Sequence, residues 1–170
     1  MQPPVARSAG RLVSLAIAIL AAACSSVPPL ANTVDSPDAL ARAVLDAVAR
    51  RDRPALDAIA LGEQEFRDHV WPELPAARPE RNLPFSYVWG DLRQKSEASV
   101  GRTLAEHGGH RLELVSIAFL GETTQYKSYL VRRKTELTVK DSTGAEQHVQ
   151  LFGSVIEQSG RFKVFSYVVD

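Results

Sequence analysis

Four runs rich in β-branched and aromatic residues fill the last third of the chain, from Arg111 to Asp170. They cover residues 112–119, 126–139, 148–157 and 161–169. Side chains of these types suit a pleated, half-buried surface. Short polar stretches containing Gly144 and Gly160 separate the last three runs, and glycine accepts the positive φ that hairpin turns need. The block therefore predicts an antiparallel meander.

Alternation along each run assigns the two faces of the predicted strand. The last run is apolar on both faces, with Phe162 and Val164 on one and Phe165 and Tyr167 on the other. A strand of this kind is usually covered on both sides. We therefore expect the final strand to lie in the middle of the sheet, or to have its second face covered by a partner subunit.

Helix signals precede the strand block. Ser36 followed by Pro37 is typical of a helix start. Apolar residues then recur at helical spacing over 40–48, and shorter helical stretches are expected after Asp52 and over 63–71. A proline-rich loop, 72–84, leads into a long helix over 85–106 that ends at two glycines. This order predicts an α+β fold class, with N-terminal helices packed on a curved C-terminal antiparallel sheet.

The N-terminal segment has the pattern of a targeting signal. Arg7 and Arg11 precede an apolar stretch, 12–23, that is too short to span a bilayer. Cys24, the only cysteine of the chain, follows Leu20-Ala-Ala-Ala23, and this arrangement resembles the lipobox of bacterial lipoproteins. The resemblance implies cleavage before Cys24 and its acylation. An ordinary secretory signal with an incidental cysteine is the alternative.

The resemblance also implies a location and a division of the chain. In the common Gram-negative pattern, a residue other than Asp after the cysteine, here Ser25, directs a lipoprotein to the outer membrane rather than the inner one. We expect a signal peptide over 1–23, a flexible tether over 24–35 and one domain over 36–170, on the periplasmic side. The formal net charge is zero, which gives no case for nucleic-acid binding. The expected partners are the membrane, through Cys24, and an envelope protein or a second copy of the chain.

The element order and the last strand, Gly160-Arg-Phe-Lys-Val-Phe-Ser-Tyr-Val168, resemble the NTF2-like (cystatin-like, SnoaL-type) α+β cone. Residues 70–91 are also similar to bacterial lipoproteins that carry such a domain. The resemblance implies a pocket between the bent sheet and the helices. The fold hosts isomerases, hydrolases, dehydratases and non-catalytic binding or dimerisation modules, so the fold alone decides no function.

Arg133 is the candidate charge of this pocket. By alternation it shares a face with Tyr129, Val131 and Thr135, and a buried arginine must be paired or must face a ligand anion. The alternative is a β-bulge between Val131 and Thr135 that turns Arg133 outward.

Three aromatic residues, Trp71, Tyr87 and Trp89, flank the proline-rich loop. They form either the rim of a pocket or partner surface, or a set of anchors that pin the loop to the core.

The runs offer no convincing pair of acid and base groups, because their inward faces carry almost no carboxylate. We therefore predict a binding or assembly module rather than an enzyme, with no catalytic residue assigned. The alternative is a small-molecule isomerase or hydrolase of the SnoaL type, with Tyr129, Arg133 and Tyr167 as its polar pocket groups. No cofactor is predicted, and no metal site either, because His107 and His110 lack the two further ligands that zinc would need.

Overall fold

The computed structural model describes residues 28–169 and shows an α+β domain in which helices precede antiparallel sheets. The predicted fold class is confirmed at this level. The expected signal peptide, Cys24 and the first part of the expected tether lie outside the described residues. Within residues 28–169, no helix is both long and apolar enough to cross a membrane.

Two capped helices open the domain. Helix α1 (Pro37–Ala49) begins at Ser36, whose hydroxyl accepts a hydrogen bond from the Ala39 amide at 3.1 Å. Helix α2 (Arg53–Ala58) begins at Asp52 in the same way, and both helices carry proline in their first turn. These starts are the ones that the sequence predicts.

A run of short turns then leads to the long helix. It comprises α3 (Glu63–Glu65), the π-helical turn η1 (Phe66–Val70) and the 3₁₀ turns η2 (Trp71–Glu73), η3 (Pro75–Ala77) and η4 (Pro79–Arg81). Helix α4 (Phe85–His107) follows, one residue longer than predicted. The predicted proline-rich loop is therefore largely a series of 3₁₀ turns, because proline fits the first or second position of each turn.

Seven strands form two antiparallel sheets. The three-stranded sheet has the order β1 (Glu113–Phe119), β4 (Thr135–Lys140), β5 (Glu146–Val149). The four-stranded sheet has the order β2 (Thr123–Gln125), β3 (Leu130–Arg133), β6 (Ser154–Gln158), β7 (Arg161–Ser166). All the strand pairs are antiparallel, as predicted, whereas β2 was not among the predicted strands.

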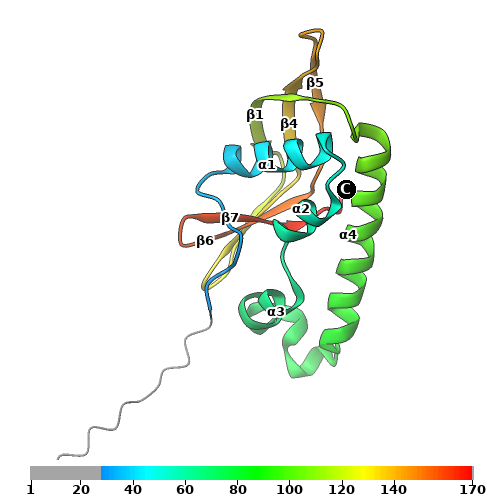
Figure 1. Ribbon diagram of the computed structural model, residues 1–170. Coiled ribbons are helices and arrows are strands. Elements are labelled where there is room, and N and C mark those ends of the chain that lie inside the picture. Colours follow the sequence, from blue (N-terminus) through cyan, green and yellow to red (C-terminus); the bar gives the residue numbers. More distant parts are fainter. Residues whose placement is uncertain (1–27, 170) are drawn as a thin grey trace, which may run out of the picture.

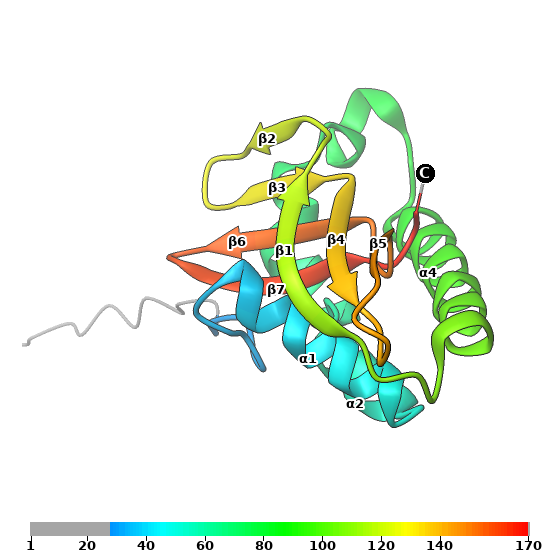
Figure 2. The ribbon, with the colours of Figure 1, turned by 90° about the horizontal axis from the view of Figure 1, so that it is seen from above.

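The two sheets share bent strands. The long predicted strand 126–139 breaks at Lys134, which has a φ of 51°, so β3 enters one sheet and β4 the other. The predicted strand 148–157 breaks in the same way around Gly153, between β5 and β6. The Gly153 carbonyl accepts a hydrogen bond from the Thr135 amide at 3.2 Å, which links the sheets at the bend. Figures 1 and 2 show α1 on one side of the sheets and α4 alongside them.

The final strand does not lie in mid-sheet, and that prediction is wrong. Strand β7 is at the end of its sheet, beyond β6. Its outer edge is covered by two segments of the same chain: Val34 exchanges two backbone hydrogen bonds with Phe162, and Leu61 donates one to the Val164 carbonyl at 2.8 Å. On one face of β7, Phe162 and Val164 belong to a buried apolar cluster, and on the other face Phe165 packs against a second cluster. Within residues 28–169, both faces are therefore covered by the chain itself.

Residues 30–35, expected to belong to the flexible tether, instead pack on the domain. Leu30 is 7% exposed, and Val34 bridges to β7. The Ala31 carbonyl accepts a hydrogen bond from the Lys163 ammonium at 2.8 Å, and its amide donates one to the Glu65 carboxylate at 2.8 Å. The sequence gives no periodicity here because the segment is fixed by backbone bonds rather than by an apolar stripe.

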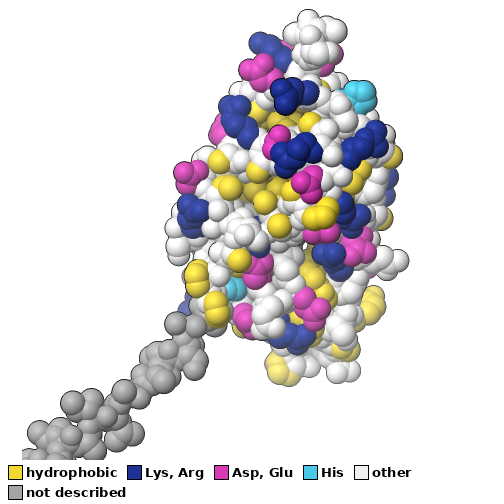
Figure 3. All heavy atoms as spheres, viewed as in Figure 1, with side chains coloured by type: hydrophobic (Ala, Val, Ile, Leu, Met, Phe, Trp, Pro, Cys, Tyr) yellow, Lys and Arg dark blue, Asp and Glu magenta, His cyan; other side chains and the backbone are white. Residues whose placement is uncertain are grey.

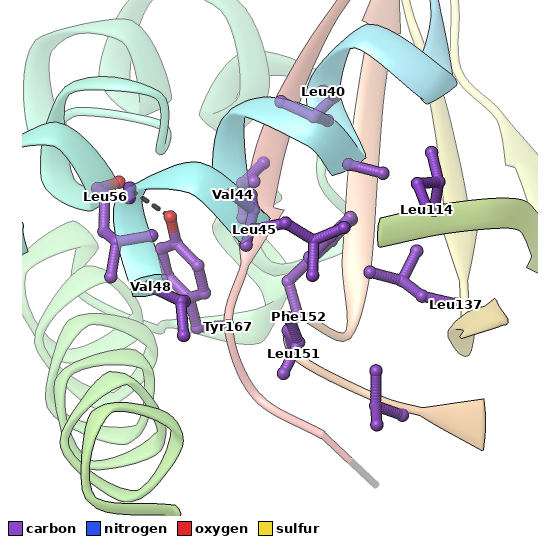
Figure 4. Packing of buried hydrophobic residues seen from close by; sticks show 14 of the residues in the cluster. Leu40, Val44, Leu45, Val48, Leu56, Leu114, Leu137, Leu151, Phe152 and Tyr167 are labelled. Atoms are coloured by element: carbon purple, nitrogen blue, oxygen red, sulfur yellow. Dashed lines mark hydrogen bonds between the residues drawn. The ribbon is translucent and has the colours of Figure 1, made fainter. Parts of the chain in front are cut away.

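Two apolar clusters hold the fold together. The larger one joins α1, α2 and the C-terminal half of α4 to the three-stranded sheet and to β6 and β7, and Figure 4 shows part of it. There Tyr167 points at α2, and its hydroxyl donates a hydrogen bond to the Leu56 carbonyl at 2.7 Å. The smaller cluster centres on Phe66, Val70 and Tyr129 beneath the turns and the N-terminal half of α4.

Candidate functional site

An open cavity of about 390 Å³ lies between α4 and the four-stranded sheet. Most of its wall is apolar, and side chains from α4, the short turns and the sheet all contribute. The apolar lining consists of Phe66, Leu74, Val88, Leu92, Tyr126, Val131, Phe165 and Val168. This volume is within the range of small-molecule sites, which are mainly apolar with a few polar groups.

A row of polar residues crosses the sheet at one side of this apolar wall. Arg133 on β3 is the register partner of Ser154 on β6, and Ser154 is the partner of Ser166 on β7. All three line the cavity. Directly opposed residues of antiparallel strands have side chains on the same face, about 5 Å apart. The row therefore presents one guanidinium and two hydroxyl groups to the same cavity.

An ion pair on α4 supplies the other charges of the cavity. Lys95 donates a hydrogen bond to the Asp91 carboxylate at 2.8 Å, one helical turn earlier. The hydrogen bond and the charge of Asp91 raise the pKa of Lys95. These two charges compensate each other, whereas Arg133 forms no ion pair with any other residue of the described range 28–169.

Comparisons of the chain with protein-family models, with curated proteins and with solved structures found no match. The site must therefore be read from its own geometry.

The three aromatic candidates do not form a common rim. Trp71 packs edge-on against Phe85 at 5.6 Å between ring centroids, and Trp89 packs on Phe66 at 5.2 Å. Both indoles thus tie the turns and the start of α4 to the smaller core cluster. Tyr87 is 66% exposed. None of the three lines the 390 Å³ cavity.

The two tyrosine candidates lie in the core. The Tyr129 hydroxyl donates to the Val70 carbonyl at 3.3 Å, and the Tyr167 hydroxyl donates to that of Leu56. Each side chain is 2% exposed, and burial raises the pKa of both phenols above the ordinary value. Both tyrosines remain neutral at physiological pH and act as structural hydrogen-bond donors.

Arg133 is the one candidate of the six pocket residues that lines the cavity. It is exposed, and the chain kinks at the next residue, Lys134. The register of β3 with β6 is unbroken through Arg133, so the expected β-bulge is not present; the strand ends instead at the kink of Lys134. This kink leaves Arg133 at the open side of the cavity rather than buried among the apolar residues of its strand.

Sequence reasoning missed the hydroxyl partners of Arg133. Alternation along one strand predicts which face of the sheet Ser154 and Ser166 occupy, but not which residue of the next strand lies beside them. Their alignment with Arg133 depends on the register of three strands. Asp91 and Lys95 lie on α4, and nothing in the helical pattern of the sequence indicates that they border a cavity. Within residues 28–169, no group of three or more His, Asp or Glu side chains is arranged to hold a metal ion.

Charged side chains of both signs are interspersed over the face that Figure 3 shows. This distribution fits the zero formal charge of the whole chain.

Proposed function

We propose that this protein is a lipid-anchored component of the bacterial cell envelope whose domain binds a small molecule without catalysing its conversion. The observation that carries the proposal is the open cavity between α4 and the four-stranded sheet, with its apolar wall and polar row. Its acidic lining residue, Asp91, is engaged by Lys95, which leaves no evident general base beside the apolar wall.

We further propose that the domain is an NTF2-like cone. The support is the order of short helices, long helix and antiparallel meander, together with strands that bend at Lys134 and around Gly153. Those bends enclose space between the sheet and α4, where a cone would hold its ligand.

Acylation of Cys24 would hold the domain close to the bilayer. Leu30, six residues after Cys24, is buried against the domain. A fully extended chain covers at most about 3.6 Å per residue, so this connection reaches about 22 Å at most. The proposed anchor therefore places the domain at the membrane surface rather than far from it.

Binding is tested with the full-length protein in phosphatidylcholine nanodiscs, with empty nanodiscs as the blank. Saturation-transfer NMR with 2-naphthol, a neutral arene, should give a signal with the wild type. Val88→Trp fills the cavity from α4 and should remove that signal. Gln94→Trp places the same side chain on the exposed side of α4 and should leave it unchanged. No transfer to the wild type would refute the binding function.

The anchor is tested separately in a Gram-negative host. Metabolic labelling with an alkynyl fatty acid should tag the wild type and leave it in the membrane fraction. Cys24→Ala should abolish the label and shift the protein out of that fraction. A labelled or equally membrane-bound Cys24→Ala protein would contradict lipidation at this residue.

An isomerase or hydrolase of the SnoaL type is the second candidate, favoured by the presence of a cavity lined with Asp91, Arg133 and two serines. Tyr129 and Tyr167, which that reading needs as pocket groups, donate their hydroxyls to core carbonyls instead. Catalysis would have to use Asp91, so Asp91→Asn should abolish any turnover and leave binding of 2-naphthol intact.

A further inference from the structure

We propose that the ligand of the cavity is an organic carboxylate with an apolar body, whose carboxylate binds Arg133. The inference rests on the proposed binding function and specifies the chemical class of the ligand. Three features carry it: the Arg133 guanidinium, which forms no ion pair among residues 28–169, the two hydroxyls in register with it, and the apolar wall beside them.

The charge balance of the cavity residues favours an anionic ligand. Lys95 and Asp91 compensate each other, so Arg133 is left as the uncompensated charge among the cavity residues. Arg133 has no ion-pair partner within 4 Å among residues 28–169, although its neighbour Arg132 binds Glu157 at 2.5 Å. A single excess positive charge is matched by a ligand with a single negative charge.

The arrangement of hydrogen-bond donors in the cavity favours a carboxylate among the possible anions. A guanidinium presents parallel N–H groups that fit the two oxygens of a carboxylate. Ser154 stands directly across from Arg133 in the sheet, and Ser166 follows in the same row. The Ser166 hydroxyl accepts a hydrogen bond from the Val168 amide at 3.0 Å, which leaves its proton free to donate. Donors from three strands thus converge on one side of the cavity.

The apolar wall of the cavity favours a ligand with an apolar body. Next to the polar row, Val131 and Phe165 on the sheet face Val88 and Leu92 on α4 across the cavity. A volume of about 390 Å³ accepts a bicyclic ring or a medium-length acyl chain. A small hydrophilic acid would leave this apolar surface in contact with water and would gain little from it.

The test compares two probes of equal size, 2-naphthoate and the uncharged 2-naphthamide. Equilibrium dialysis against the full-length protein in nanodiscs, with empty nanodiscs as the blank, gives both dissociation constants. A charge-assisted hydrogen bond to Arg133 at the open side of the cavity should favour naphthoate by about tenfold. Arg133→Gln should reduce this preference to about onefold and leave naphthamide binding unchanged.

Two further variants distinguish binding at Arg133 from a general effect of positive charge near the cavity. Lys134→Gln removes the same charge from the next residue, which lies outside the cavity, and should keep the tenfold preference. Arg133→Lys keeps the positive charge but lacks the planar guanidinium, and it should retain part of the preference for naphthoate. Equal affinity of the two probes for the wild type would overturn the carboxylate assignment while the binding function stands. Absence of binding by both probes would overturn the binding function itself.

Discussion

The ion pair between Lys163 and Glu65 should be the most stabilising polar contact of the N-terminal attachment. The Lys163 side chain is 3% exposed and that of Glu65 is 18% exposed. The ammonium donates to both carboxylate oxygens at 2.8 Å and to the Ala31 carbonyl. We predict that Lys163→Met lowers the free energy of unfolding by about 3 kcal/mol at neutral pH.

The magnitude follows from what the substitution leaves behind. Removing one partner of a buried ion pair costs about 3–5 kcal/mol, because the other charge stays buried without compensation. Here Glu65 keeps hydrogen bonds from the Gly62 and Ala31 amides, and a methionine side chain fills most of the vacated space. The lower end of that range is therefore expected. In a double-mutant cycle, Glu65→Gln should then cost little more in the Lys163→Met background.

Urea unfolding followed by the fluorescence of the two tryptophans measures this change. Lys140→Met is the matched control, because Lys140 pairs with Glu146 on an exposed hairpin and should contribute nothing measurable. A loss below about 1 kcal/mol for Lys163→Met would refute the claim that this pair secures the N-terminal segment to β7.

Three other substitutions test separate parts of the account. Gly153→Ala should cost about 3 kcal/mol in urea unfolding, because an added Cβ would lie 1.6 Å from the Val168 carbonyl oxygen; a neutral result would contradict the close approach at the bend. Tyr167→Phe should cost about 1–3 kcal/mol, because the Leu56 carbonyl loses its buried donor; an unchanged midpoint would count against that bond. Glu65→Gln should change the pH dependence of stability. Burial alone raises the pKa of the Glu65 carboxyl, but hydrogen bonds from Lys163, Gly62 and Ala31 and the lysine charge lower it below its ordinary value. A depressed pKa stabilises the folded state above about pH 4.3 and loses that effect as the pH falls through the folded pKa. The stability difference between wild type and Glu65→Gln should thus shrink below pH 4.3, and a difference that grows there would contradict the pKa shift.

Local signals in the sequence were sufficient for the helices and for most strands. Ser36, Asp52 and the glycines after α4 mark helix ends by backbone chemistry that acts within a few residues. The burial of β4 follows the alternation of its sequence, with Thr135, Leu137 and Val139 buried. Such features depend on neighbours in sequence, so the sequence displays them.

Features that depend on residues far apart in the sequence could not be predicted from local patterns. The edge position of β7 depends on Val34 and Leu61, which are far from it in sequence. Lys163 lies between two apolar residues and would be read as a solvent-exposed charge, because its partner Glu65 is 98 residues away. The cavity row depends on strand register, which alternation within one strand cannot supply.

The location of ligand binding is the most direct test of the central claim. Methyl NMR of the isotope-labelled protein, titrated with 2-naphthoate, reports which side chains the ligand touches. We predict shifts for Val88, Leu92, Val131 and Val168, which line the cavity. Shifts confined to the exposed side chains of Val115 and Leu120, with none in the cavity, would contradict it.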